Sequence, residues 1–260
     1  MEGANAISMR ASDGSVVKIE YHKRLDSALA LAREYAKLGY PDRYAVVCEY
    51  ENSRDGDSRG IYISCILRPS IFPAQAGLLS SLAAVALATG LDAHSTKKMG
   101  IGWVSNIYCD GKPIGSASIE GMLDNDFITY EYIIVNFSAK LSDEDFPNRI
   151  SDLVKKVFEA DNESVTAIIA KSVLNRFFPF YSNLRNNTKY MNIYKQKFVL
   201  NGVKIKLITD GKSKKETCRI VGIDPDYCTL LVERKNGSIE AVKSPTKVII
   251  PKHIKLSKRS

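Results

Sequence analysis

The chain has 260 residues, and its hydrophobic content of 45% is enough for a buried core, while its length exceeds the usual range of one domain. The five cysteines have unrelated spacings and form no C-x-x-C pair, which argues against a disulfide framework or a zinc site and favours reduced, mostly buried thiols in a cytoplasmic protein. The net charge of +8 is uneven, because residues 1–183 carry a net −4 and residues 184–260 a net +12.

The first part of the chain is predicted to alternate strands and helices. Residues 15–21 form a short strand, and a helix capped by Asp26 or Ser27 follows with apolar residues at intervals of three and four. Residues 44–50 and 60–67 then form two strands on either side of a polar loop. Strand and helix patterns in this order favour a sheet that is packed against helices.

The stretch from residue 71 to residue 91 carries no charge and is long enough to span a bilayer. Its small and polar residues dilute the hydrophobicity, with Pro73 near the start and Gly90 near the end. These features predict a buried helix lying on a sheet rather than a membrane span. The first residues show no basic segment leading into an apolar one, so no secretory signal is expected.

The second part begins with a hairpin around residue 111, and an apolar strand follows over residues 127–137. Two helices are expected next, one over residues 150–158 and one over residues 163–178. Beyond Lys197 the pattern consists of short strands, with turns at Asn201-Gly202, Asp210-Gly211 and Asn236-Gly237. We therefore expect an α+β core of mixed sheet and helices over residues 1–195, and a small β-barrel domain with a basic tail over residues 196–260.

The hairpin at Asp110-Gly111 holds the most suggestive lysine of the chain. Asp-Gly between apolar runs is a strong hairpin signal, so Lys112 lies at or just after a tight turn. Gly115 and Ser116 follow, and such small residues would let a ligand approach the strand while the lysine neutralises a carboxylate or phosphate. An ordinary solvated turn is the alternative.

Three further segments add to this hairpin a resemblance to a known family. The Lys112-x-x-Gly115 element resembles the lysine strand of the biotin and lipoate protein ligase superfamily. Residues 59–69 are similar to the strand that follows the glycine and arginine loop of that family, and the apolar stretch after them to its central helix. Residues 221–237 are similar to the small SH3-like barrel that ends biotin protein ligases. The match runs in the same order along nearly the whole chain.

The resemblance implies an enzyme that activates biotin with ATP and Mg²⁺ and transfers the acyl group to a lysine of an acidic carrier domain. Lys112 would be the catalytic cation, and a homodimer is compatible with this family. The resemblance gives no protein ligand for a metal. The residues that would contact biotin or the adenylate are Ser27, Arg54, Gly56, Trp103, Gly115 and Ser116.

Several positions depart from the family pattern. The loop over residues 49–59 carries four acids against two arginines, whereas the family repeats glycine and arginine there, and such a loop would tend to repel ATP. Glu51 falls near the place of a glutamine that contacts the vitamin. Of the segment that serves nucleotide and metal in the family, only Trp103 remains. The family's Ser-Thr-Asn motif at the first helix is replaced here by Asp26-Ser27-Ala28, in which only Ser27 is a plausible match.

Two hypotheses from different classes follow. The first is a divergent biotin ligase, and the second is a non-catalytic descendant that uses the same scaffold to bind a small acid, a carrier domain or another partner. A lipoate or octanoate ligase is a third interpretation, which the tail does not favour. The sequence predicts no membrane association.

The basic tail allows a fourth interpretation as a nucleic-acid-binding module. Its lysines could form a positive face, but the region has no aromatic-rich strand pair and no recognition-helix pattern, so nucleic acid is the less favoured partner. The three histidines stand apart from other metal-ligating residues and are interpreted as structural.

Overall fold

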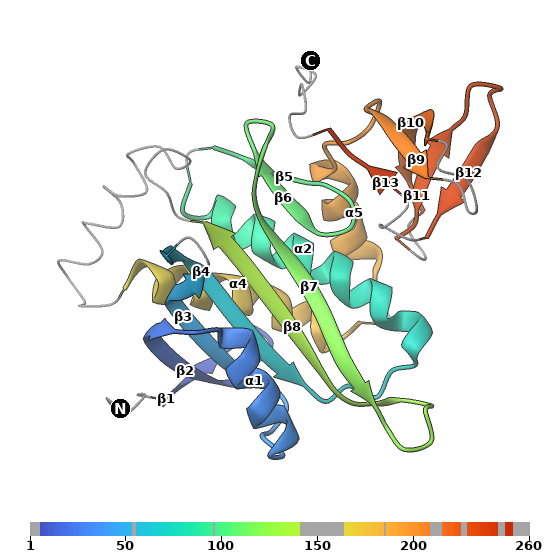
Figure 1. Ribbon diagram of the computed structural model, residues 1–260. Coiled ribbons are helices and arrows are strands. Elements are labelled where there is room, and N and C mark those ends of the chain that lie inside the picture. The colour runs from blue at the N-terminus through green and yellow to red at the C-terminus, as the bar shows by residue number, and fades with distance from the viewer. Residues whose placement is uncertain are drawn as a thin grey trace.

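The computed structural model describes residues 6–53, 56–95, 97–140, 164–184, 186–208, 215–224, 228–243 and 248–251. An eight-stranded mixed sheet with helices on both faces forms the main body, and a smaller sheet lies at one side (Figure 1). This arrangement confirms the α+β core expected from the sequence.

The main sheet has the strand order β1-β2-β3-β4-β8-β7-β6-β5. The pair β2 and β3 is parallel, and every other neighbouring pair is antiparallel. The strands are β1 Ala6–Arg10, β2 Val16–Leu25, β3 Tyr44–Ser53, β4 Gly56–Leu67, β5 Met99–Ile101, β6 Asn106–Cys109, β7 Lys112–Leu123 and β8 Tyr130–Lys140.

The described helices divide between the two faces of this sheet. In Figure 1, α1 lies in front of the sheet, and α2 and α4 lie behind it. The turns of α1 place three buried alanines against the sheet, while α2 is buried along most of its length. The helices are α1 Ala28–Lys37, α2 Ala76–Asp92, α4 Val165–Tyr181 and α5 Thr188–Lys197, with a short 3₁₀ turn Pro73–Gln75 before α2.

The helix α2 accounts for the uncharged stretch noted in the sequence. It packs against the sheet and against α4, and Gly90 lets the two helices approach closely, because a Cβ atom there would lie 2.5 Å from Cγ2 of Val173. Among the described residues, no helix combines the length and apolarity needed to cross a membrane.

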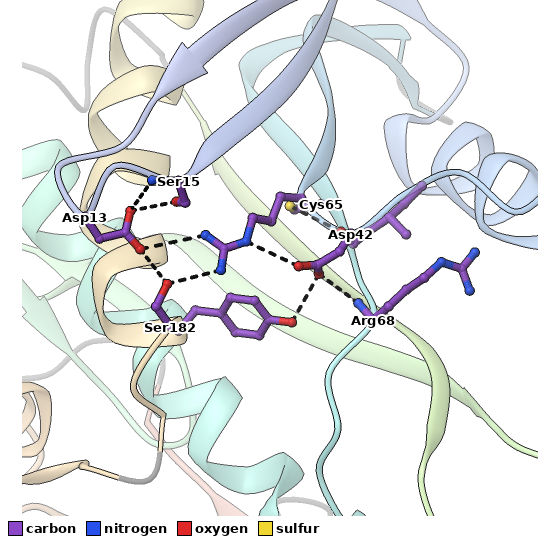
Figure 2. A network of polar contacts seen from close by, with 9 residues as sticks. Asp13, Ser15, Asp42, Cys65, Arg68 and Ser182 are labelled. Carbon is purple, nitrogen blue, oxygen red and sulfur yellow. Dashed lines mark hydrogen bonds and ion pairs between the residues drawn. The ribbon is translucent and has the colours of Figure 1, made fainter.

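A polar network fastens the end of α4 to the sheet (Figure 2). Arg43 donates from Nε to Asp42 (3.2 Å) and from Nη2 to the Ser182 hydroxyl (3.1 Å), and Tyr181 donates to Asp42 (3.2 Å). Asp13, in the turn between β1 and β2, accepts from Ser182 and lies 3.7 Å from Arg43. The network therefore joins the β1–β2 turn, the start of β3 and the C-terminal end of α4.

The smaller sheet is antiparallel, with the order β12-β11-β10-β9-β13. Gly202 and Gly237 have positive φ, as the predicted turns at these positions require. Whether this sheet closes into an SH3-like barrel, and whether a domain boundary lies at residue 195, stay predictions. The strands are β9 Lys204–Ile208, β10 Lys215–Ile223, β11 Leu230–Glu233, β12 Ile239–Val242 and β13 Val248–Ile249.

Some elements differ from the sequence prediction. The strand predicted to begin at residue 127 begins at Tyr130, because Phe127 adopts a positive φ in the turn before it. The sequence patterns missed β1, β5 and α5, of which the first two are too short for a clear period. The helix predicted over residues 150–158 and the Asp210-Gly211 turn lie outside the described residues.

Candidate functional site

The N-terminus of α1 lies beside the end of β3 and forms one wall of the candidate site. Ser27 is the N-cap residue, and its hydroxyl accepts a hydrogen bond from Ala30 N (3.3 Å). The Glu51 carboxylate accepts a hydrogen bond from Ala28 N (2.6 Å). Two N–H groups of the first helical turn are thus satisfied, one by Ser27, a predicted site residue, and one by Glu51, which departs from the family pattern.

Glu51 is half-buried at this position. Burial raises the pKa of its carboxyl group above the ordinary value, and the hydrogen bond from Ala28 opposes that shift. Its charge also contributes to the raised pKa of Tyr62, after the larger effect of burial. Glu51 therefore places a negative charge between the helix N-terminus and the sheet.

The sheet face under α1, called the α1 face below, is crossed by three rows of paired side chains on β3, β4, β8 and β7. Directly paired residues of antiparallel strands point to the same face of the sheet. The row farthest from the helix N-terminus is apolar apart from its last member, and the other two rows are rich in small polar residues. The rows are Tyr44, Ile66, Ile134 and Glu120; Val46, Ser64, Asn136 and Ser118; and Cys48, Tyr62, Ser138 and Ser116.

The polar side chains of the second and third rows use only some of their hydrogen-bonding groups in contacts with other side chains. Ser64 donates to the Asn136 side chain (2.8 Å), and Tyr62 donates to Ser58 (2.8 Å). Asn136 and Ser138 are half-buried rather than fully covered. The end of the α1 face nearest Glu51 therefore offers hydroxyl and amide groups that a small polar ligand could contact.

The only sulfur in these rows does not supply a nucleophile. The Cys48 thiol is buried and donates to the carbonyl of Tyr50 (2.9 Å). Burial raises the pKa of Cys48 to about 11, so the thiol stays protonated at neutral pH. Chemistry at this face thus depends on binding and charge rather than on a covalent cysteine intermediate.

A side-chain clasp joins α1 to the β7 end of the first row, the row farthest from the helix N-terminus. Arg33 on α1 donates from Nε and Nη2 to the two carboxylate oxygens of Glu120 on β7 (2.5 and 2.7 Å). The contact reaches across β8, because Glu120 is paired with Ile134. It holds α1 over the apolar part of the face and leaves the polar end beyond the helix N-terminus.

The predicted catalytic lysine lies at the start of β7. Asp110 and Gly111 both have positive φ, which confirms the tight turn expected there. Lys112 is paired with Cys109, and its side chain is exposed. It makes no side-chain hydrogen bond or ion pair with the part of the chain that the structure describes. The ammonium is therefore accessible at the rim of the sheet and is not held in a buried cavity.

Two other predicted residues have packing roles in the structure. A Cβ atom on Gly115 would lie 2.3 Å from the carbonyl oxygen of Ser138, so the close approach at this glycine is to β8. Trp103 is 2% exposed, and its indole N–H donates to the carbonyl of Cys228 (2.8 Å). Cys228 lies just before β11 of the small sheet. Trp103 therefore connects the main body to the C-terminal sheet.

The remaining predicted positions follow β3 in the sequence. Gly56 is the first residue of β4 and is paired with Ser53, whereas Arg54 lies outside the described residues. Arg59 donates to buried Glu49 (3.1 Å), which also accepts from the Tyr21 hydroxyl (3.1 Å). The Arg59 guanidinium is thus bound to an acid of its own sheet.

The structure brings Ser27 and Ser116 to the α1 face and adds residues that sequence reasoning missed. Tyr62, Asn136 and Ser138 join Ser116 only through the register of three strands. The alternation of Asn136 and Ser138 with apolar residues was the one signal for them in the sequence. Among the described residues, no group of three or more metal-ligating side chains could hold a metal ion.

Comparison with known proteins shows what the sequence and fold of this chain are similar to. No family model matches the chain. The bifunctional ligase/repressor BirA of Bacillus spizizenii is 25% identical over 154 residues, which is 56% of this chain and 47% of that protein. The chain therefore spans about half the length of the curated relatives that it matches.

Solved structures extend the likeness to most of the fold. A point variant of the Aquifex aeolicus biotin protein ligase in complex with biotin matches with a TM-score of 0.66 at 17% identity, covering 90% of this chain and 97% of that one. The same ligase in complex with biotin and ATP matches with a TM-score of 0.61 at 16% identity, covering 90% and 98%. The chain therefore shares its fold with biotin protein ligases and is similar in sequence to part of a ligase/repressor.

Proposed function

We propose that the protein is a biotin protein ligase-type enzyme that activates biotin with ATP and transfers it to a lysine of a carrier protein. One observation carries the proposal: 90% of the chain shares its fold with a ligase solved in complex with both substrates. The polar end of the α1 face, beside the N-terminus of α1, supports it as the binding place. The proposal includes an SH3-like barrel over residues 196–260 after a catalytic core over residues 1–195.

In the proposed reaction, a carboxylate oxygen of the acid attacks the α-phosphorus of ATP and pyrophosphate leaves. The amine of the carrier lysine then attacks the acyl carbon and AMP leaves. Mg²⁺ enters with ATP as part of the substrate, bound mainly by phosphates. No covalent enzyme intermediate is needed, so the protein acts by positioning and by stabilising charge.

Residues of this chain can be assigned to these tasks. The α1 N-terminus with Ser27, and Ser116 with Ser138, would hold the acid by hydrogen bonds. Exposed Lys112 would turn toward the reacting oxygens when the anions are bound and neutralise their charge. Arg54, and Gly56 at the start of β4, would cover the adenylate.

A second candidate function is a catalytically degenerate homologue that binds a ligand or a partner. Two observations favour it. Glu51 places a carboxylate at the helix N-terminus, where it repels a second anion, and Arg59 is bound to Glu49 instead of facing a ligand. An acidic carrier domain would still be a fitting partner for the basic tail, and a homodimer fits either function.

Pyrophosphate release separates the two functions. The full chain with MgATP and biotin should release pyrophosphate, and Lys112→Ala should lower the rate at least about 100-fold if its charge acts in the transition state. Lys18→Ala, at an exposed position of β2, is the matched control and should keep the rate. No release with biotin, lipoate or octanoate would refute the enzyme, and heat of biotin binding without turnover would favour the degenerate homologue.

A further inference from the structure

The outer face of the small sheet, meaning the face turned away from its buried residues, carries a regular array of cations. In β9 and β10, exposed and buried residues alternate. Apart from Thr217, the exposed positions are occupied by Lys204 and Lys206 on β9 and by Lys215 and Arg219 on β10. None of these four side chains makes an ion pair or hydrogen bond with the described residues. The described part of the chain thus leaves these charges on two neighbouring strands without a side-chain partner.

Strand pairing places some of these charges against each other. Lys204 is paired directly with Arg219, and Thr217 is paired with Lys206. Like charges that lie directly opposite destabilise a sheet, so the pairing of Lys204 and Arg219 costs stability unless an anion lies over both. Glu233, paired with Arg219 on the other side, is the one acid among the described strand residues of this face.

A shallow groove runs over the same residues. Its volume is about 340 Å³, and Lys204, Thr217, Arg219, Glu233 and Lys235 contribute to its lining. Arg234 also contributes but is already bound to Glu216 and Glu240. The free charge that lines the groove is therefore mainly positive.

We propose that this outer face binds the phosphate backbone of a nucleic acid without reading its sequence. Cations two residues apart along a strand are about 6.7 Å apart, and paired cations about 5 Å apart, so the array needs anions that are equally dense and regular. A polynucleotide supplies such anions, and Arg219 can bind a phosphate through two parallel hydrogen bonds. Residues 184–260 add a net charge of +12 to attract it.

An acidic protein surface is a poorer match for this array. Its carboxylates are scattered among other side chains, and they would leave paired cations such as Lys204 and Arg219 partly uncompensated. The array also lies on the small sheet, which is beyond the β5 edge of the main sheet, whereas α1 lies over the opposite half of the main sheet (Figure 1). The proposed nucleic-acid surface is therefore separate from the polar end of the α1 face.

Fluorescence anisotropy tests the proposal with the full chain and a labelled 20-base-pair duplex DNA, its single strand and poly-glutamate. Binding of DNA should weaken steeply with salt. In the double variant Lys204→Gln with Arg219→Gln, the slope of log K against log [salt] should fall by about 1.8 for the duplex or about 1.4 for the single strand. Affinity at 100 mM salt should fall at least about fivefold.

Two controls keep the result interpretable. The double variant Lys18→Gln with Lys37→Gln removes two exposed charges of the main body and should leave both slope and affinity unchanged. Glu233→Gln should raise affinity for DNA, which tests the face without removing a cation. Absence of DNA binding at 50 mM salt, or equal losses in both double variants, would overturn the proposal. Tighter binding of poly-glutamate than of DNA would overturn it in favour of an acidic protein partner.

Discussion

The two faces of the main sheet are filled in different ways. Behind the sheet, α2 and α4 cover the face, and large side chains such as Phe137 of β8 and Phe177 of α4 are fully buried between them. In front, α1 covers part of the face with the buried alanines Ala28, Ala32 and Ala36 and leaves the rows near its N-terminus polar. The face behind the sheet stabilises the fold, and the α1 face keeps hydrogen-bonding groups that a ligand can contact.

The largest effect expected from this difference is the loss of an aromatic ring behind the sheet. Phe177 packs against Phe137, Phe178 and Tyr181. Phe177→Ala should lower the free energy of unfolding by about 3–5 kcal/mol, because a buried ring leaves a cavity. Denaturant unfolding measures this loss.

The same substitution at an exposed ring is the matched control. Phe127 lies in the β7–β8 turn and is 75% exposed, so Phe127→Ala should change the free energy of unfolding by less than about 0.5 kcal/mol. Similar losses for the two variants would contradict the division between a packed face and an open one.

A smaller effect is expected at the N-terminus of α1. Ser27→Ala removes the hydroxyl that accepts from Ala30 and should cost about 1 kcal/mol of unfolding free energy. Ser27→Gly should cost only a few tenths of a kcal/mol, since glycine is itself a favoured cap. Thermal unfolding of the two variants without ligand measures the cap alone, and equal costs would mean that Ser27 does not cap the helix.

The sequence predicted single elements and turns better than the side-chain rows formed by strand pairing. Local signals were sufficient for a helix cap at Asp26 or Ser27, the turn before Lys112 and the uncharged helix α2. The row of Tyr62, Ser138 and Ser116 depends on the register of β4, β8 and β7, which no local pattern contains. The bond from Trp103 to Cys228 joins residues far apart in the chain, and so does the contact of Gly115 with β8. The assignment of both residues to ligand contact comes from the family resemblance and stays a prediction.

Glu51 allows a test of the open face by pH. Its pKa is raised mainly by burial, so the folded state binds a proton more readily than the unfolded state. The stability contribution of Glu51 is therefore fully present below its unfolded pKa and is lost as pH rises through the raised folded pKa. Glu51→Gln should thus raise Tm by about 2 °C at pH 7 and change it little at pH 4.

The outcome at low pH decides whether the charge is responsible. Glutamine keeps an oxygen that can accept from Ala28 N, so the variant removes the charge and little else. A gain in Tm that is equal at pH 4 and pH 7 would contradict the assigned cause. If the ligase proposal holds, the variant should also bind biotin more tightly, because a carboxylate no longer opposes that of the vitamin.

The smallest effect concerns the clasp between Arg33 and Glu120. Both side chains are largely accessible, with exposures of 47% and 35%, so solvent screens the ion pair. A double-mutant cycle with Arg33→Ala and Glu120→Ala should give a coupling energy of about 0.5 kcal/mol that declines with added salt. Because the clasp holds α1 across the sheet, the single variants should affect ligand affinity more than stability. A coupling above about 2 kcal/mol would instead make the clasp part of the packed structure, and the open face would then be as rigid as the face behind it.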